Sequence, residues 1–289
     1  MIAITGANGQ LGRLVLEHLA SLTDDPIRAL ARSPDKARDL ASAQITVVKA
    51  DYDDPASLPA ALQGVDRLLL ISGSEVGKRT PQHVAVIDAA KASGVGFIAY
   101  TSLLNAPGSS LMLAKEHIAT ERHLRGCGIP HAILRNGWYV ENFVGTIAAA
   151  LAHGAVVGAS GNGKFSAAGR KDYAQAAARI VSGSDLSTRT LELAGHPAFS
   201  LDDLAAEISR QSGREIPFTN LPEETYAGVL IQAGLPEGFA AVLADSDRGA
   251  SQGELFSAST ALQELIGHPT RALGDFVAEA LENSQPAPA

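Results

Sequence analysis

The sequence has few of the residues that would indicate a disulfide scaffold, a membrane protein or a nucleic-acid binder. Cys127 is the single cysteine among 289 residues, which excludes an intrachain disulfide and a thiolate zinc site. No apolar run reaches the roughly 18 residues of a membrane span, and Met1–Thr5 carries no basic signal region. The net charge of -8 argues against a general phosphate-backbone binder. We therefore expect a cytoplasmic protein that binds neither membrane nor nucleic acid.

Two further scarcities concern metal and thiol chemistry. The eight histidines form no pair at metal-binding spacing beside carboxylates, so we expect no metal site. The segment "RGCGIP" predicts that Cys127 is a small, partly buried apolar side chain, in preference to a reactive thiol. An oligomer is compatible with the sequence.

Short apolar runs that alternate with helical patterns dominate the first half of the chain. The runs are rich in Ile, Leu and Val and cover residues 2–5, 27–31, 45–50, 67–72, 96–102 and 131–135. Such alternation requires crossover connections, and near-continuous apolar strands are covered by helices on both faces. The sequence therefore predicts an α/β fold with a doubly wound, Rossmann-type parallel sheet. Three pairs indicate helix starts: Ser33–Pro34, Asp54–Pro55 and Thr80–Pro81.

The second half is less regular and predicts a smaller, mostly helical lobe. We expect a helix from Val140, a glycine-rich stretch over 158–169, helices over 173–181 and 201–212, and short helices beyond. A strand near 190–194 is expected to return to the sheet. We divide the chain into a sheet domain over 1–155 and an interleaved, substrate-side lobe over 156–289. The tail 282–289 is expected to fray.

Three glycines at an even spacing of three lie between the first apolar run and the first helix pattern. In a strand–turn–helix unit, such glycines permit a tight turn, backbone approach to a pyrophosphate, and close contact between strand and helix. Gly6, Gly9 and Gly12 occupy these places, and the following helix points its positive end at the phosphates. The sequence therefore predicts a dinucleotide site, with the GxxGxxG spacing of short-chain dehydrogenases.

The type of cofactor is indicated by the residue about 20 positions beyond the glycines. The strand there ends on Arg32, with Lys36 one turn further on, which favours NADP(H) over NAD(H); the alternative is a solvated cation. Ligands of open parallel sheets lie beyond the carboxyl ends of the strands. We therefore expect cofactor contacts at further strand ends, although any one hydroxyl can be a helix cap: Asp51, Tyr52, Ser72, Gly73, Ser74, Thr101 and Ser102.

Five segments together resemble the NmrA-like, atypical short-chain dehydrogenases, in particular their bacterial NADPH-dependent quinone reductases, with triphenylmethane dye reductases as near relatives. They are "MIAITGANGQLG", "GVDRLLLISGSEVGKRTPQH", "FIAYTSLLNA", "KEHIATERHL" and "LRNGWYVENF". The resemblance implies a Rossmann-type sheet, NADPH across its carboxyl edge, and reduction of a quinone or similar flat acceptor without flavin. It implies that the adenosine and pyrophosphate side is held by Gly6, Asn8, Gly9, Gln10, Leu11 and Arg32. It implies further contacts around the ribose and nicotinamide from Ser72, Gly73, Asn136, Gly137, Trp138, Tyr139 and Asn142, with Arg170 closing over the cofactor.

The Tyr-x-x-x-Lys pair of the superfamily is broken in this chain. Lys115 stands at the lysine position, but Leu111 replaces the tyrosine that protonates a carbonyl. A simple ketone needs that acid, whereas a quinone gives a delocalised hydroquinone anion that takes its proton from water. The missing tyrosine agrees with quinone reduction and weakens the alternative of a sugar-nucleotide epimerase.

His117 and Tyr139 are the candidate catalytic residues. Histidine readily delivers protons near neutral pH, and the rings of Trp138 and Tyr139 could form a wall for a flat acceptor. A structural role for His117 and core packing for the two aromatic residues are the alternatives. A functional alternative also remains: a redox sensor that binds NADP(H) without turnover.

Overall fold

The computed structural model describes residues 1–284 and contains one large parallel sheet. Its seven strands are ordered β3-β2-β1-β4-β5-β6-β9, and every neighbouring pair is parallel. This is the doubly wound order, with its switch point between β1 and β4. The strands are β1 (Ile2–Ile4), β2 (Ile27–Ala31), β3 (Ile45–Lys49), β4 (Arg67–Leu70), β5 (Phe97–Leu103), β6 (His131–Asn136) and β9 (Arg189–Leu193). The predicted fold class is confirmed, and β9 is the expected returning strand.

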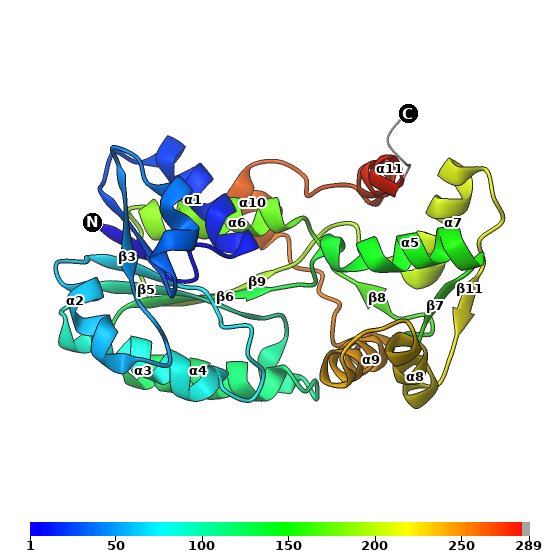
Figure 1. Cartoon of the computed structure of the whole chain (residues 1–289), viewed down its shortest axis with the longest axis horizontal. Helices are drawn as coiled ribbons and strands as arrows, with labels where there is room; N and C mark the ends of the chain where they lie inside the picture. Colours follow the sequence, from blue (N-terminus) through cyan, green and yellow to red (C-terminus); the bar gives the residue numbers. More distant parts are fainter. Residues whose placement is uncertain (285–289) are drawn as a thin grey trace.

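Helices cover both faces of this sheet (Figure 1). One face carries α1 (Gln10–Leu22), α6 (Arg170–Ser182) and α10 (Ala261–Ile266), and the other carries α2 (Leu58–Leu62), α3 (Arg79–Ala92) and α4 (Ala114–Gly126). On the first face, Leu16 and Leu19 of α1 share one buried apolar cluster with Tyr173 of α6. Burying such side chains contributes about 1.5–3 kcal/mol each, so the sheet and its two helix layers form the main core.

The predicted helix starts are partly right. The 3-10 helices η1 (Pro34–Leu40) and η2 (Pro55–Ser57) follow Ser33 and Asp54, but neither side chain caps its helix. The third prediction is wrong by two residues, because α3 begins at Arg79 and Thr80 lies inside its first turn. A carboxylate from α4 takes over the capping there, since Glu116 Oε1 accepts from the Thr80 backbone N–H at 3.4 Å.

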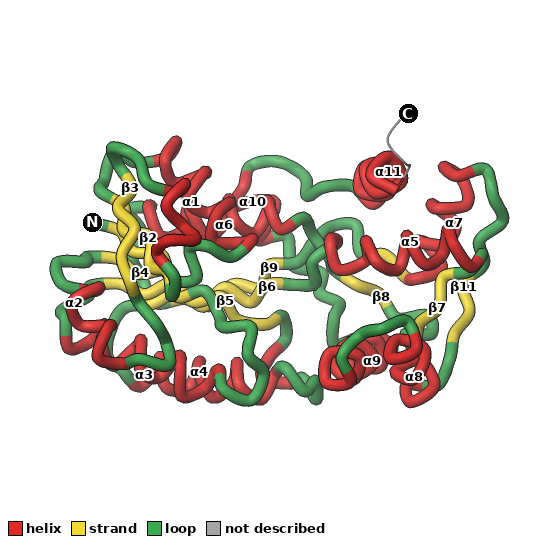
Figure 2. The backbone as a smooth tube through the Cα atoms, in the orientation of Figure 1, coloured by secondary structure: helices red, strands yellow, loops and turns green. Residues whose placement is uncertain are grey.

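The second half of the molecule lies beside the carboxyl edge of the sheet (Figure 2). Its helices and short turns are η3 (Ala106–Gly108), η4 (Val140–Phe143), α5 (Val144–His153), α7 (Leu201–Ser212), α8 (Glu223–Gln232), α9 (Glu237–Ser251) and α11 (Leu273–Ser284). Four short strands were not predicted: β7 (Val156–Gly158) pairs with β11 (Phe218–Asn220), and β8 (Lys164–Phe165) pairs with β10 (Phe199–Ser200). Gly163 of the 158–169 stretch allows this region to approach α9 closely, because a Cβ there would overlap the backbone of Ala250.

The chain crosses between the two halves more than once. Helices α6 and α10 follow residue 155 in the sequence and yet pack on the sheet beside α1 (Figure 1). The boundary at residue 155 stays a prediction, as does the substrate-side role of the lobe. Fraying was expected over 282–289, but residues 282–284 belong to the last turn of α11 (Leu273–Ser284), and residues 285–289 lie outside the described part. Within residues 1–284, no helix is long and apolar enough to cross a membrane.

Candidate active site

The glycine loop between β1 and α1 forms one side of the site. Gly6 has a φ of +59°, which an L side chain rarely adopts, and its carbonyl accepts from the Gly9 N–H at 2.9 Å. A Cβ on Gly12 would lie 2.8 Å from Ala7 Cα, so the third glycine allows α1 to pack directly on the loop. Asn8 is held by Arg13, whose Nη2 donates to its Oδ1 at 2.5 Å. Leu11 is buried, while Gly9 and Gln10 are exposed at the start of the 13-residue helix α1, where backbone N–H groups are available to an anion.

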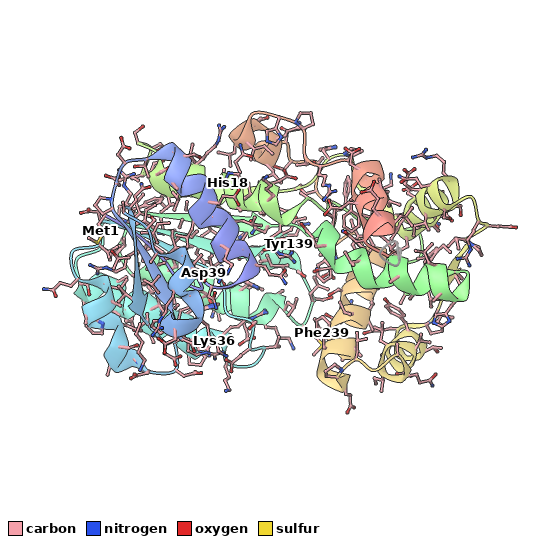
Figure 3. The ribbon with its side chains drawn as sticks, turned by 45° about the horizontal axis from the view of Figure 1, so that its top comes forward. Met1, His18, Lys36, Asp39, Tyr139 and Phe239 are labelled. Carbon is pink, nitrogen blue, oxygen red and sulfur yellow. The ribbon has the colours of Figure 1, made fainter. Side chains whose placement is uncertain are left out.

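Two cations lie beyond the end of β2. Arg32 is 67% exposed, and its Nη1 donates to Glu75 Oε1 at 3.1 Å. Lys36 is exposed on η1, and Figure 3 places it with Asp39 on the sheet half of the molecule. Glu75 also accepts from Lys78 Nζ at 3.0 Å, and that bond raises the pKa of Lys78. A cluster of positive charge that includes the carboxylate of Glu75 therefore lies beyond β2, on the side where we expect the adenosine 2′-phosphate.

The ends of β3, β4 and β5 are joined by side-chain hydrogen bonds. The Tyr52 hydroxyl donates to the Ile71 carbonyl at 2.9 Å, and burial raises the pKa of this phenol. The Ser72 N–H donates to Thr101 Oγ1 at 2.9 Å. These contacts hold the backbone beyond β4 in one position, next to the glycine loop.

A buried histidine holds Gly73. The Gly73 N–H donates to His83 Nε2 at 2.9 Å, so that nitrogen carries no proton and the other, Nδ1, donates to Thr120 Oγ1 at 2.9 Å. Burial lowers the pKa of His83 to about 4, so it is neutral at physiological pH. Arg79 completes this contact, because its Nε donates to the Gly73 carbonyl at 2.6 Å.

His117 lies on the inner face of α4 and is 5% exposed. Its Nδ1 shares a hydrogen bond of 2.8 Å with the Tyr100 hydroxyl, and burial lowers the pKa of His117 to about 3. The side chain is therefore a neutral imidazole packed against Tyr100. Its catalytic role stays a prediction.

A buried ion network lies beneath the ends of β5, β6 and β9. Arg135 donates to both oxygens of Glu121, at 2.9 Å and 2.7 Å, and its Nη1 donates to Glu192 at 2.6 Å. The Ser102 hydroxyl donates to Glu121 Oε1 at 2.7 Å, and the Asn105 N–H to Glu192 Oε2 at 2.9 Å. The network fixes three strand ends relative to α4.

The segment after β6 forms the border between the sheet and the lobe, where Figure 3 places Tyr139. The Arg170 guanidinium carbon lies 4.8 Å from the centre of the Tyr139 ring, which also makes an edge contact with Tyr173 at 5.3 Å. Glu141 accepts from the Arg170 N–H at 2.9 Å and so binds the start of α6. Trp138 is half-buried, and its carbonyl accepts from the Ala168 N–H at 3.0 Å. Tyr139 packs against the apolar cluster of the sheet half, and Trp138 packs against that of the lobe, so this pair contacts both halves.

Leu111 is fully buried, whereas Lys115 is exposed. A Cβ on Gly249 of α9 would overlap the Leu111 side chain, so Leu111 fills the contact between the two halves. The position that carries an acidic hydroxyl in other short-chain dehydrogenases is here an apolar packing residue.

These residues fit a dinucleotide phosphate. The loop backbone, the start of α1 and Arg32 together match the anionic groups. In addition, the side-chain oxygen Oδ1 of Asn136, at the end of β6, is buried without a hydrogen-bond partner among the described residues. A buried acceptor is costly to leave unpaired, and the carboxamide of a nicotinamide offers the N–H groups that would satisfy it.

The comparison with known proteins agrees with this geometry. The model of the NmrA-like family matches residues 1–269. The chain belongs to the NmrA-like family. This NmrA-like chain is 54% identical to quinone oxidoreductase 2 of Escherichia coli over 96% of its own length and 97% of that protein. The structure of the NADPH-dependent quinone oxidoreductase of E. coli with NADPH superposes with a TM-score of 0.95 at 53% identity, covering 97% of this chain and 100% of that one. The triphenylmethane reductase of Citrobacter sp. with NADP(H) gives 0.93 at 36% identity, with 97% and 100% covered.

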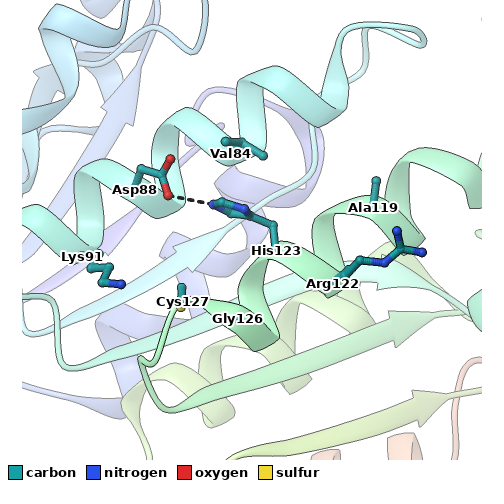
Figure 4. Close-up of a pocket in the computed structure, with 8 residues that line it drawn as sticks. All are labelled: Val84, Asp88, Lys91, Ala119, Arg122, His123, Gly126 and Cys127. Carbon is teal, nitrogen blue, oxygen red and sulfur yellow. Dashed lines mark hydrogen bonds and ion pairs between the residues drawn. The ribbon is translucent and has the colours of Figure 1, made fainter.

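Two hollows of this NmrA-like protein lie outside the residues expected to hold the cofactor. The larger, of about 450 Å³, lies between α3 and α4 around the Asp88–His123 pair and the buried Cys127 (Figure 4). The smaller, of about 340 Å³, lies beside the start of α6 and includes Glu141 and Arg271. Only the smaller one adjoins residues expected at the cofactor.

Several supporting residues escaped the sequence analysis: Glu75, Arg79, His83, Glu121, Arg135 and Glu192. All of them except Arg79, which donates to Gly73 six residues away, have a partner distant in the sequence, so no local motif marks them. The one available signal was the polar pattern of His117, Thr120 and Glu121 on the face of α4 that also buries Ala114 and Leu124.

Proposed function

We propose that this protein is a flavin-independent, NADPH-dependent quinone reductase. The observation that carries the proposal is Leu111, which is buried and apolar at the position of the superfamily's proton-donating tyrosine. The same chain carries the glycine loop and the cation Arg32 that we propose for the dinucleotide. The high identity to the quinone oxidoreductase of E. coli supports the same activity.

The cofactor is held by backbone and cations. The pyrophosphate lies at Asn8, Gly9, Gln10 and the start of α1, where N–H groups and the helix dipole favour an anion. Arg32, with Lys36 nearby, receives the 2′-phosphate. The remaining contacts proposed are Gly6, Leu11, Asp51, Tyr52, Ser72, Gly73, Ser74, Thr101, Ser102, Asn136, Gly137, Trp138, Tyr139, Asn142 and Arg170.

NADPH supplies a hydride when bound, and the quinone takes up this hydride and one further proton to give the hydroquinone and NADP⁺. The chain positions the two flat molecules and excludes water from between them. Leu111 cannot donate a proton to the product. The hydroquinone anion can take its proton from solvent because its charge is delocalised. A simple ketone would lose about 10²- to 10⁴-fold without such an acid.

Tyr139 and His117 have different places in this proposal. Tyr139, half-buried under Arg170, forms the wall of the acceptor site. His117 acts on the acceptor from α4, where its Nδ1 is hydrogen-bonded to the Tyr100 hydroxyl of β5. The acceptor is a small molecule, and its identity within the quinones and similar conjugated compounds is left to the assay.

The experiment is a steady-state assay of flavin-free protein with NADPH and a panel of benzoquinones, naphthoquinones and a cationic triphenylmethane dye. We expect NADPH consumption well above the uncatalysed rate with at least one quinone. Lys115→Ala serves as a control and should retain this activity, because Lys115 is exposed.

A folded preparation that binds NADPH but oxidises it with no acceptor would overturn the proposal. The redox-sensor alternative would then require different affinities for NADPH and NADP⁺, because two ligands bound equally by both states shift no conformational equilibrium.

A further inference from the structure

The segment 73–78, between β4 and α3, is held near both of its ends and carries one carboxylate that reaches another strand end. Its first residue, Gly73, is bonded to His83, as described above. Towards its other end, the Gly77 N–H donates to Glu116 Oε2 of α4 at 2.9 Å. Glu75 lies between these anchors, and its side chain extends to another strand end.

Glu75 is fully engaged by two cations. Oε1 accepts from Arg32 at 3.1 Å and Oε2 from Lys78 at 3.0 Å. Both cations are mostly exposed, at 67% and 63% of their side-chain surface, and Glu75 is 37% exposed. Among the described residues, the carboxylate of Glu75 is hydrogen-bonded by these two cations alone, and each cation can exchange it for another anion.

The contact bridges the cofactor side of the sheet. Arg32 follows β2 and Glu75 follows β4, and β1 lies between these two strands. The pair therefore spans the carboxyl end of β1, where the glycine loop begins. An anion that approaches Arg32 from this side therefore finds its guanidinium already paired with the carboxylate of Glu75.

We propose that Glu75 is an internal competitor of the cofactor's 2′-phosphate for Arg32, and so a residue that sets cofactor affinity and specificity. The inference rests on the proposed NADPH-binding function. The phosphate carries a charge of about -1.5 to -2 at neutral pH and cannot share Arg32 with a carboxylate without repulsion. Binding of NADPH therefore replaces the Arg32–Glu75 pair with an Arg32–phosphate pair. NADH has no group that competes for Arg32 and leaves the pair in place.

Removing the charge of Glu75 should therefore tighten NADPH selectively. The exposed ion pair is weak and the repulsion is partly screened, so we expect Glu75→Gln to lower the Kd of NADPH by about 3- to 10-fold. The Kd of NADH should change by less than about twofold because no 2′-phosphate is involved. The measurement is calorimetric titration of the full-length protein with each nucleotide.

The control is Asp35→Asn on η1. Asp35 is an exposed carboxylate near Lys36 that pairs with Arg38, not with Arg32. It makes the same change in net charge, so a gain in NADPH affinity equal to that of Glu75→Gln would assign the effect to general electrostatics and overturn the proposal.

A double variant tests the route through Arg32. In an Arg32→Gln background, Glu75→Gln should give no gain in NADPH affinity, and an undiminished gain there would overturn the competition. An unchanged or weaker NADPH affinity of Glu75→Gln alone would also overturn it. Failure of the proposed NADPH binding would give a different result. Either the wild-type protein would not bind NADPH, or Arg32→Gln would leave the Kd of NADPH unchanged. In both cases the proposed competition fails as well.

Discussion

Substitution of single glycines by alanine should separate cofactor binding from folding in the loop after β1. At Gly9, φ is -74° and ψ is 165°, which alanine adopts freely, and the added Cβ would lie 3.2 Å from the Gly6 carbonyl oxygen. This contact needs a shift of a few tenths of an ångström. Alanine is a poorer helix N-cap than glycine, so we expect Gly9→Ala to cost about 0.5–1 kcal/mol of stability.

The same methyl group should be costly to the bound state. It lies on the exposed loop surface, where backbone N–H groups must approach the pyrophosphate. We expect NADPH affinity to fall at least about tenfold. At a concentration of about 100 times the wild-type Kd, stabilisation by NADPH should then fall from about 2.7 to about 1.4 kcal/mol, which corresponds to a few degrees of Tm.

Gly12→Ala should have the opposite pattern. Its Cβ would meet backbone, including Ala7 Cα at 2.8 Å, which cannot move aside as a flexible side chain would. Overpacking of about 1–3 kcal/mol or more exceeds the gain of about 1 kcal/mol in helix propensity. Thermal melts of both variants with and without NADPH provide the comparison. A Gly9→Ala protein that keeps the full wild-type stabilisation by NADPH would refute the role of this loop.

Four further outcomes are expected. Arg32→Asp should lower NADPH affinity by about 1.5–3 kcal/mol and invert the preference over NADH; an unchanged affinity ratio in titrations would contradict this. Arg135→Met should lower the free energy of unfolding by denaturant by about 3–5 kcal/mol, because it leaves the buried Glu121 without its main partner. Arg125→Met, at an exposed arginine, should lower it by less than about 1 kcal/mol. Equal losses would contradict the role of the buried network. Tyr139→Ala, which removes the ring proposed as the wall of the acceptor site, should reduce kcat with a quinone by more than it weakens NADPH binding. The reverse order would remove Tyr139 from the acceptor site. Between pH 6.5 and about 4, the unfolded chain takes up a proton on His83 that the native state does not, since burial lowers the native pKa to about 4. Stability should therefore fall on acidification, by up to about 1.4 kcal/mol per pH unit from this residue, and His83→Gln should have a flatter pH profile of unfolding.

Features with a short sequence period could be predicted from the sequence. The apolar runs gave all six strands of the first half, and "TLELAG" indicated β9 although the strand lies beyond the lobe's first elements. The loop after β1 could be predicted because its three glycines lie within seven residues and each meets a local requirement of the strand–turn–helix unit. The 2- and 3-residue strands β7, β8, β10 and β11 could not, because pairs so short carry no periodic signal.

Contacts that depend on topology could not be predicted. Arg32 and Glu75 are 43 positions apart, and Arg135 and Glu192 are 57 apart. Only the strand order brings these partners to one edge of the sheet. The electrostatic environment of Arg32, which the sequence shows only as a cation after a strand, is therefore a property of the fold.

His117 illustrates the limit of residue type as a guide. The residue type made His117 a candidate for proton delivery, with a structural role as the alternative. The helix turns this position inward, one turn from the buried Ala114 and Thr120, and its catalytic role stays a prediction. A polar residue on a buried helix face meets hydrogen-bond partners before it meets solvent, and here that partner is Tyr100.

A single-turnover experiment tests the central claim, direct hydride transfer at this site, most directly. Flavin-free protein saturated with NADPH, deuterated at one or the other face of its nicotinamide, is mixed rapidly with excess benzoquinone while absorbance at the nicotinamide band is followed. The account predicts rapid, protein-dependent loss of this absorbance that is slowed by deuterium on one face only. Decay at the rate seen without protein, or loss that occurs only after flavin is added, would contradict it.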